Sequence, residues 1–352
     1  MSETVLSQPQ LNRALLARQH LLDRATRPIE RVLEDVGGLQ TQYAPAGYIG
    51  LWSRMAGFER PMLTAALEER RVIQATLMRA TIHMVSAEDY WPIEIAVRSP
   101  RREWWLRVAR SQIEEIDVDA LTAAIGEELA AGPARQKDLV DRLKARDFPI
   151  TYSSIYLLAD VVRVPPSGTW ERRRADLYGL AEEWLPPPHP PPTEAEAALH
   201  LVRRYLAGFG PAKVAEIGDF AGLPITTVRA AFGELTPRRF RDEAGGELVD
   251  LPHAPLPDSD TPAPPRFLPV WDATLLVHAR RTQILPEEFR ARVFNTKTPH
   301  SVNTFLLDGQ VAGAWRYDKG RLSLEPFRTL TRTERAALED EAHRLEAFHA
   351  DS

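Results

Sequence analysis

Gly132-Pro133-Ala134-Arg135 recurs as Gly210-Pro211-Ala212-Lys213, and this repeated stretch decides the expected fold. Each copy follows one helical stretch and opens another, in which apolar residues fall at helical spacing. A further short helical stretch comes next, at residues 152–162 and 225–235. Turn residues then signal a hairpin in both places. Helices followed by a short hairpin outline a winged helix, so the chain is predicted to carry such units in tandem.

The N-terminal third predicts another unit with the same outline. Apolar residues at helical spacing indicate helices over 11–22, 28–36 and 61–71. Residues 78–84 then change to a period of two, in which apolar residues alternate with Arg79, Thr81 and His83. This alternation predicts a half-buried strand with a polar face. Ser86-Ala87-Glu88-Asp89 resembles the capped start of the next helix.

The last part of the chain changes character after two proline runs, at 186–192 and 252–269, which suit stiff connections. Strands are predicted within 267–281, and Asp308-Gly309 predicts a hairpin between two strands. A last strand at 322–324 precedes a helix that begins near Thr331.

The sequence therefore predicts an α+β fold of tandem winged-helix (helix-turn-helix) modules with a small C-terminal β-barrel. Three winged-helix-like units are expected at residues 1–110, 111–192 and 193–260. The barrel and its C-terminal helix are expected at residues 261–352.

The composition excludes several kinds of chemistry. The 352 residues include no cysteine, which excludes disulfides and thiolates and suits a reducing cytoplasm. The nine histidines show no metal-ligand spacing, and no phosphate-binding glycine loop is present. The chain has no apolar run long enough to cross a membrane and no secretory signal. We therefore expect a cytoplasmic protein without metal, cofactor or membrane partner.

Arginines gather locally although the formal net charge is −5. Five arginines and one acid lie between Arg98 and Arg110, and two further clusters are Arg172-Arg173-Arg174 and the stretch 266–297. Nucleic-acid binding needs such a local basic face rather than a positive total. For any single cluster, a solvated helix face is the favoured interpretation. Trp104-Trp105 is expected in the core or in an interface rather than as a stacking platform.

Gln40-Thr41-Gln42 follows Gly37-Gly38 at the end of an apolar helical pattern. Residues two apart point the same way on a strand but in nearly opposite directions on a helix. The two amides can therefore serve one site only if the glycines end the helix. Alone, Gln-x-Gln occurs often by chance, and solvent-facing or capping amides would be the simpler interpretation.

Several segments nevertheless resemble the AlkZ/YcaQ family of bacterial winged-helix DNA glycosylases. The resemblance runs in order along nearly the whole chain, through 38–42, 51–54, 79–91, 267–272, 278–281 and 305–316. The family signature is Gln-hydrophobic-Gln in the AlkZ-like branch and Gln-hydrophobic-Asp in the YcaQ-like branch. Gln42 is similar to the former, and Thr41 departs from the hydrophobic middle position.

The resemblance implies tandem winged helices and a β-barrel that form a channel for double-stranded DNA. It implies excision of bulky N-alkylated purines and unhooking of interstrand crosslinks joined through guanine N7, as in DNA repair or self-resistance to a genotoxic antibiotic. Gln40 and Gln42 become the candidate catalytic residues. Candidate DNA-binding residues are Arg79, Thr81, His83, His278, Arg280 and Arg281. For the first three, a face bonded within the protein is an equal alternative, and the last three would contact phosphates or a groove.

This activity is chemically sensible for two amides. Alkylation at N7 makes guanine cationic, so the base departs as a neutral molecule and needs no general acid. An amide is not a general base near neutral pH, but it can orient water and place a negative dipole near the sugar. No lysine or terminal amine suggests Schiff-base chemistry, so a monofunctional glycosylase is expected. We also expect a monomer.

Two other functions remain open from the sequence. The first is a non-catalytic winged-helix DNA-binding protein, such as a regulator or a damage sensor. The second is a repeat scaffold that binds another protein.

Overall fold

The computed structural model describes residues 4–108, 117–275, 279, 281–295 and 300–350. The helices of its N-terminal third are α1 (Gln8–Arg18), α2 (Ile29–Val36), α3 (Ala44–Arg54), α4 (Arg60–Glu68) and α5 (Ala87–Val108). Helices α1, α2 and α4 confirm the three predicted helical stretches. Ser86 begins α5 as predicted, because its hydroxyl oxygen accepts a 3.1 Å hydrogen bond from the N–H of Asp89.

Helix α3 was not predicted, because it lacks a polar face. All of its 11 residues are buried. A helix that is covered on every side has no amphipathic period in its sequence. It also begins with Ala44-Pro45 directly after the glutamine pair, so its position matters for the candidate site.

The prediction of a strand over 78–84 is wrong for residues 78–80, which form a turn. The chain forms a hairpin of β3 (Val72–Thr76) and β4 (Ile82–Ser86), joined by the turn η1 (Met78–Ala80). Arg79 and Ala80 have φ angles of 53° and 54°, a left-handed conformation that is uncommon for residues with side chains. The supposed polar face is therefore the tip of a hairpin. Strand β3 itself is buried throughout and shows no alternation.

A six-stranded antiparallel sheet joins residues 39 to 180. Its order is β2-β4-β3-β6-β7-β5. The strands not yet described are β2 (Leu39–Gln40), β5 (Ala134–Arg135), β6 (Val161–Arg163) and β7 (Leu177–Leu180). Strand β2 lies at one edge, so Gln40 stands at the edge of this six-stranded sheet.

The repeated stretches do open two similar arrangements, which we call the helix–hairpin modules. The first contains α6 (Val118–Ala130), α7 (Gln136–Lys144), α8 (Tyr152–Leu158) and the β6–β7 hairpin. The second contains α10 (Glu194–Phe209), α11 (Val214–Ala221), α12 (Ile225–Ala231) and the hairpin of β8 (Arg238–Asp242) with β9 (Glu247–Asp250). In both, the residue after the Gly-Pro pair joins the second hairpin strand: Ala134 pairs with Tyr178, and Ala212 with Val249.

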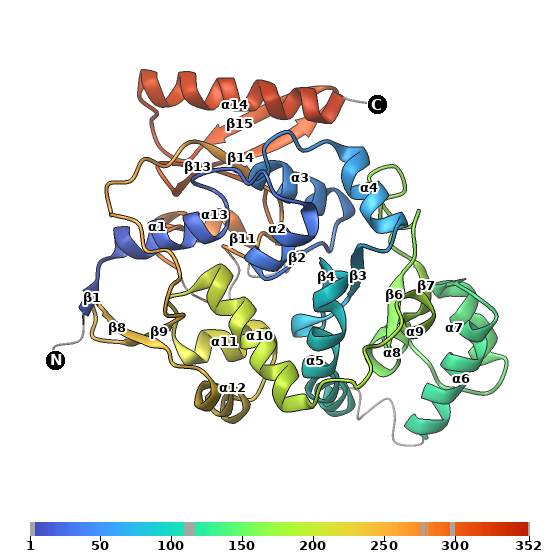
Figure 1. The fold of residues 1–352 in the computed structure, drawn as a ribbon. Helices are drawn as coiled ribbons and strands as arrows, with labels where there is room; N and C mark the ends of the chain where they lie inside the picture. Colours follow the sequence, from blue (N-terminus) through green and yellow to red (C-terminus); the bar gives the residue numbers. More distant parts are fainter. Residues whose placement is uncertain (1–3, 109–116, 276–278, 280, 296–299, 351–352) are drawn as a thin grey trace.

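The C-terminal strands form an open sheet in the described residues, and the closed barrel predicted there is not found. Its antiparallel order is β10 (Arg266–Leu268), β13 (Thr304–Leu307), β14 (Gln310–Asp318) and β15 (Arg321–Pro326). The hairpin at Asp308-Gly309, the last strand and the final helix, α14 (Arg332–Ala350), are confirmed. Helix α14 lies along this sheet (Figure 1).

The strand predicted after Asp272 is also absent wherever the chain is described. Thr274 and Leu275 form a turn, because oxygens of Asp272 accept hydrogen bonds from both backbone N–H groups. Strand β1 (Thr4–Leu6) pairs with β8, and β11 (Phe294–Asn295) pairs with β12 (His300–Ser301). Other short helices are α9 (Ala181–Trp184), α13 (Arg290–Val293), η3 (Phe232–Glu234) and η4 (Glu287–Phe289).

A buried ion pair ties α3 to the C-terminal part of the chain. The side chains of Arg54 and Asp272 are 0% and 1% exposed, and their charged atoms lie 3.0 Å apart. Arg54 also donates to Gln19 Oε1 and to the Gly50 carbonyl. Helix α3, which follows the glutamine pair, is thus held by charge as well as by apolar packing.

Candidate active site

Gly37 and Gly38 end α2 and turn the chain into β2. Their φ angles are 74° and 79°, and the Gly38 N–H bonds back to the Leu33 carbonyl at 2.8 Å. Left-handed glycines commonly end helices in this way. A Cβ at Gly38 would lie 3.0 Å from Val85 Cγ1, so a side chain would crowd β4. The glycines therefore end the helix, as the sequence requires if the two amides are to serve one site. Gln40 lies on a strand.

The two glutamine side chains are held by different partners. Gln40 is 7% exposed and its Oε1 accepts a 2.9 Å hydrogen bond from Arg79 Nη2. Gln42 is exposed, and its Oε1 accepts a 2.8 Å bond from the backbone N–H of Ile82. A carbonyl oxygen has two lone pairs, so each oxygen retains one acceptor site. Each amide is therefore held in place by one hydrogen bond while its oxygen can still accept another.

Thr41, the unusual middle residue, faces the interior. It is 1% exposed, and its Oγ1 accepts a 3.1 Å hydrogen bond from Gln74 Nε2. Its backbone N–H donates to the Ile82 carbonyl. The buried threonine hydroxyl is thus satisfied by the amide of Gln74 on β3.

Arg79 links the site to the second helix–hairpin module. Its Nη1 donates to the Phe220 carbonyl on α11 at 2.6 Å, and its guanidinium lies 4.8 Å from the ring of Phe220. Burial lowers the pKa of Arg79 to about 10, which leaves the group charged at neutral pH. The structure thus places Arg79 beside Gln40, bonded within the protein. Thr81 is bonded likewise, through its hydroxyl to the Met78 carbonyl.

His83 lies opposite Gln40 in the β2–β4 pairing and is 1% exposed. Its Nδ1 donates to the Thr81 carbonyl at 3.0 Å, while its buried Nε2 has no hydrogen-bond partner among the described residues. Burial, with the nearby charge of Arg79, lowers the pKa of His83 to about 3. The imidazole is therefore neutral at physiological pH, and it cannot supply a proton there.

Acid should destabilise the protein through His83. An unfolded histidine takes up a proton near pH 6.5, but the folded one does so only near pH 3. Between these values the unfolded state binds more protons, so this residue lowers the free energy of unfolding as pH falls, by up to about 1.4 kcal/mol per pH unit. Urea denaturation at about pH 7 and about pH 5, on either side of the pKa of an unfolded histidine, measures the change in the free energy of unfolding. A His83→Gln variant should lose part of this pH dependence, and an unchanged dependence would contradict the assignment.

Only part of the other predicted DNA-binding group can be placed. His278 and Arg280 lie outside the described residues. Arg281 is 6% exposed; it donates to the Tyr205 hydroxyl at 3.1 Å and to the Ala273 carbonyl at 3.2 Å. Its guanidinium also lies 5.0 Å from the Phe209 ring. In this arrangement Arg281 fastens α10 to the segment after Asp272.

Arginines of the α5 cluster and of the Arg172-Arg173-Arg174 run are bonded within the protein, Arg174 to Asp176 at 2.9 Å. On α5, arginines pair with acids: Arg98 with Asp160, Arg101 with Glu94, and Arg102 with Asp119. Arg173, in contrast, is exposed and donates a 2.9 Å hydrogen bond to the hydroxyl of Tyr43, the residue after Gln42. Sequence reasoning noted the Arg172-Arg173-Arg174 run but could not connect it with the glutamines, because the contact spans 130 residues.

Two features are absent from the part of the chain that the structure describes. No group of three or more His, Cys, Asp or Glu side chains could hold a metal ion in that part of the chain. None of the helices found there is long and apolar enough to cross a membrane.

One family model and one solved structure match nearly the whole chain. The model of the family described as DNA glycosylase AlkZ-like matches residues 33–348. The solved structure of Streptomyces sahachiroi DNA glycosylase AlkZ superposes with a TM-score of 0.82 at 20% sequence identity, covering 98% of both chains. Among curated proteins, no sequence matches. The chain therefore belongs to the AlkZ-like DNA glycosylase family.

Proposed function

We propose that this DNA glycosylase hydrolyses the N-glycosidic bond of N7-alkylated, cationic purines in double-stranded DNA. The geometry carries the proposal: a hydrogen bond to the β3–β4 hairpin holds each of the amides of Gln40 and Gln42, and Gln40 lies opposite His83, whose pKa burial lowers to about 3. Such a site can position water, and the neutral imidazole of His83 carries no extra proton for a departing base at neutral pH.

A cationic purine suits a site of this kind. N7-alkylguanine carries a positive charge that is neutralised as the glycosidic bond breaks, so the leaving base needs no proton. The remaining tasks are to hold water below the sugar and to stabilise the positive charge that develops there. Each glutamine oxygen offers an acceptor lone pair, a fixed negative dipole of the kind that stabilises a charged transition state. Either glutamine can fill either role.

The amide dipoles act only if they are aimed in advance. Arg79 holds Gln40, and the Ile82 N–H holds Gln42, each at hydrogen-bond distance. Both holders lie in or beside the β3–β4 turn, so one hairpin tip orients both amides. Preorganised dipoles cost no reorganisation at the moment of reaction.

We propose that the helix–hairpin modules are winged helices that grip the duplex, with Arg173 at a phosphate near Gln42. The protein acts as a monomer on bulky adducts and on interstrand crosslinks joined through guanine N7, in DNA repair or in self-resistance to a genotoxic natural product. It is monofunctional: among the described residues, no lysine takes part in the hydrogen bonds of the glutamine pair.

The test uses duplex DNA with a single N7-alkylguanine that is small, bulky or crosslinked. After incubation with the protein, alkali cleaves any abasic site, and strand breaks are counted on a gel. Breaks that appear only after alkali are expected for a monofunctional glycosylase. Binding of all three duplexes with release from none would instead support a non-catalytic DNA-binding protein.

Arg79→Met should slow the chemical step while leaving DNA binding nearly unchanged. Methionine keeps an unbranched, flexible stem, but it is shorter than arginine and has no N–H group. Gln40 Oε1 therefore loses its donor, and the amide is free to rotate. A reduction of kcat by about tenfold, with KM little changed, is expected from the loss of a charged hydrogen bond. Arg79→Lys, which can still donate, should recover part of the rate. A rise in KM alone would instead assign Arg79 to DNA contact.

A further inference from the structure

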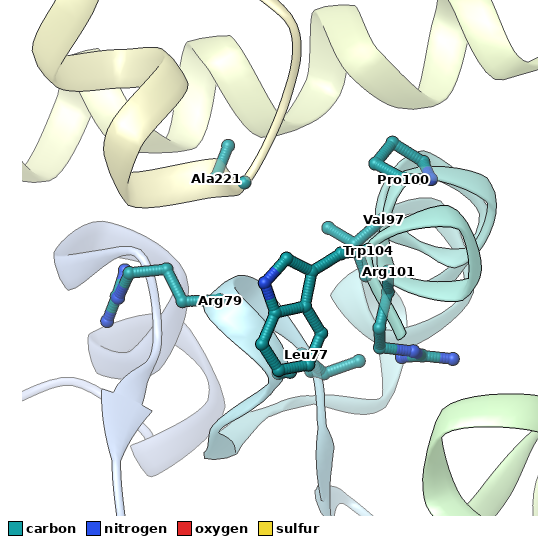
Figure 2. Close-up of a pocket in the computed structure, with 9 residues that line it drawn as sticks. Leu77, Arg79, Val97, Pro100, Arg101, Trp104 and Ala221 are labelled. Atoms are coloured by element: carbon teal, nitrogen blue, oxygen red, sulfur yellow. The ribbon is translucent and has the colours of Figure 1, made fainter. Parts of the chain in front are cut away.

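An apolar pocket of about 250 Å³ lies beside the candidate site (Figure 2). It is formed where the β3–β4 turn, the C-terminal half of α5 and the end of α11 meet. Its apolar lining consists of Leu77, Ala80, Val97, Pro100, Trp104 and Ala221. Gly222 completes the wall with a φ of 74°, and a Cβ there would lie 3.5 Å from the backbone nitrogen of Arg79.

The two arginines that line this pocket are hydrogen-bonded to groups outside it. Arg101 donates to the carboxylate of Glu94 and to the Thr76 carbonyl, both at 2.6 Å. Arg79 donates to Gln40 and to Phe220. Figure 2 shows both guanidinium groups turned away from the Trp104 indole. The surface offered to a ligand is therefore mostly carbon, which disfavours a phosphate and favours an apolar group.

Trp104 is the unusual feature of the pocket. It is 46% exposed, although its neighbour Trp105 is buried in the core. In Figure 2 its indole lies between Arg79 and Pro100, above Leu77. An exposed tryptophan that borders an apolar pocket presents a flat face on which a planar group can stack.

The volume limits what can enter. A dry cavity of about 150 Å³ accepts benzene, whereas pockets for drug-sized ligands begin near about 300 Å³. The observed volume of about 250 Å³ lies between them and suits a fused two-ring aromatic group. Arg79 connects the pocket with Gln40, because it borders the pocket and its Nη2 is 2.9 Å from Gln40 Oε1. The pocket and Gln40 are thus separated by one arginine side chain.

We propose that this pocket receives the planar aromatic part of a bulky adduct, while the purine that carries it lies at Gln40 and Gln42. Trp104 stacks on this substituent and so selects for aromatic adducts. The inference rests on the proposed function, because it assumes that the glutamine pair marks the position of the damaged purine. Small alkyl adducts do not reach the pocket and gain nothing from it.

Two duplexes test the proposal, one with a single N7-methylguanine and one with a single N7-(quinolinylmethyl)guanine. The full-length protein is compared with Trp104→Ala, with Trp104→Phe, and with Met62→Ala as a control that removes an exposed apolar side chain from α4. Trp104→Ala should lower kcat/KM for the quinolinylmethyl adduct by about tenfold, the effect of losing one stacking partner. Its rate on N7-methylguanine should not change. Trp104→Phe should restore most of the loss, and Met62→Ala should affect neither duplex.

Equal effects of Trp104→Ala on both duplexes, or no effect on either, would overturn the pocket assignment. Failure of the proposed function has a different signature, namely no base release by the unaltered protein. In that case binding of the two duplexes, followed by fluorescence anisotropy, still decides the question. If Trp104→Ala weakens binding of the quinolinylmethyl duplex but not of the methyl duplex, the result supports the pocket. If the ratio of the affinities for the two duplexes is the same as in the unaltered protein, the result overturns it.

Discussion

Alanine at Gln40 or at Gln42 should lower the single-turnover rate of base release by about 100-fold, the usual cost of deleting one preorganised dipole from an active site. Each substitution removes an oxygen that is fixed by a hydrogen bond below 3.0 Å, to Arg79 or to the Ile82 N–H. The double variant should be scarcely slower than either single one if both amides hold the same water, because residues that act as a unit are not additive.

Gln310→Ala is a suitable control for these variants. Gln310 is an exposed glutamine at the start of β14, and its side chain donates a long, 3.4 Å hydrogen bond to the Gln283 carbonyl. Its rate should equal that of the unaltered protein. Full activity in both Gln40→Ala and Gln42→Ala would remove the pair from the mechanism.

Asp272→Ala should lower the free energy of unfolding by about 3–5 kcal/mol, because it leaves Arg54 buried with no counter-charge. Both side chains of this pair are almost fully excluded from solvent. The substitution also removes the acceptor for the Thr274 N–H and hydroxyl, which shapes the turn after β10. Urea denaturation at neutral pH measures the change.

The exposed pair of Arg292 and Glu325 provides the matched comparison. Its side chains are 41% and 59% exposed, so Glu325→Ala should cost no more than about 1 kcal/mol. A similarly small cost for Asp272→Ala would show that apolar packing alone holds α3 in place. Since α3 begins directly after the glutamine pair, that result would also weaken the argument that this anchor fixes the site.

The sequence could predict elements that carry their own local signal. The Gly-Pro stretches at 132–135 and 210–213 led to both helix–hairpin modules, because a helix start and a helical period lie within a few residues of each other. Asp308-Gly309 led to the β13–β14 hairpin, since both residues adopt positive φ, at 46° and 76°. Gly37-Gly38 likewise gave the correct condition for the glutamine pair.

Elements covered on all sides could not be predicted. Helix α3 and strand β3 are buried throughout, so neither shows the alternation that reveals a partly exposed element. The η1 turn interrupts an apparent period of two because Arg79 and Ala80 adopt left-handed conformations that their residue types do not announce. The predicted barrel relied on a strand after Asp272, where the described chain makes a turn.

The contacts of the candidate site depend on the folded chain as a whole. Arg79 meets Gln40 across 39 residues and Phe220 across 141, distances at which a single sequence carries no pairing signal. The same is true of Arg173 and Tyr43. For Arg79 the sequence left DNA contact and bonding within the protein as equal alternatives, and the structure shows its guanidinium bonded to Gln40.

The central claim is that the site releases only bases that depart without a proton. Its most direct test is mass spectrometry of free bases released from two duplexes of one sequence, which carry either N7-methylguanine or hypoxanthine at the same position. Release of N7-methylguanine without release of hypoxanthine is expected, because hypoxanthine is uncharged and His83 is neutral at physiological pH. Release of hypoxanthine at a comparable rate would contradict the account, since it would require a general acid.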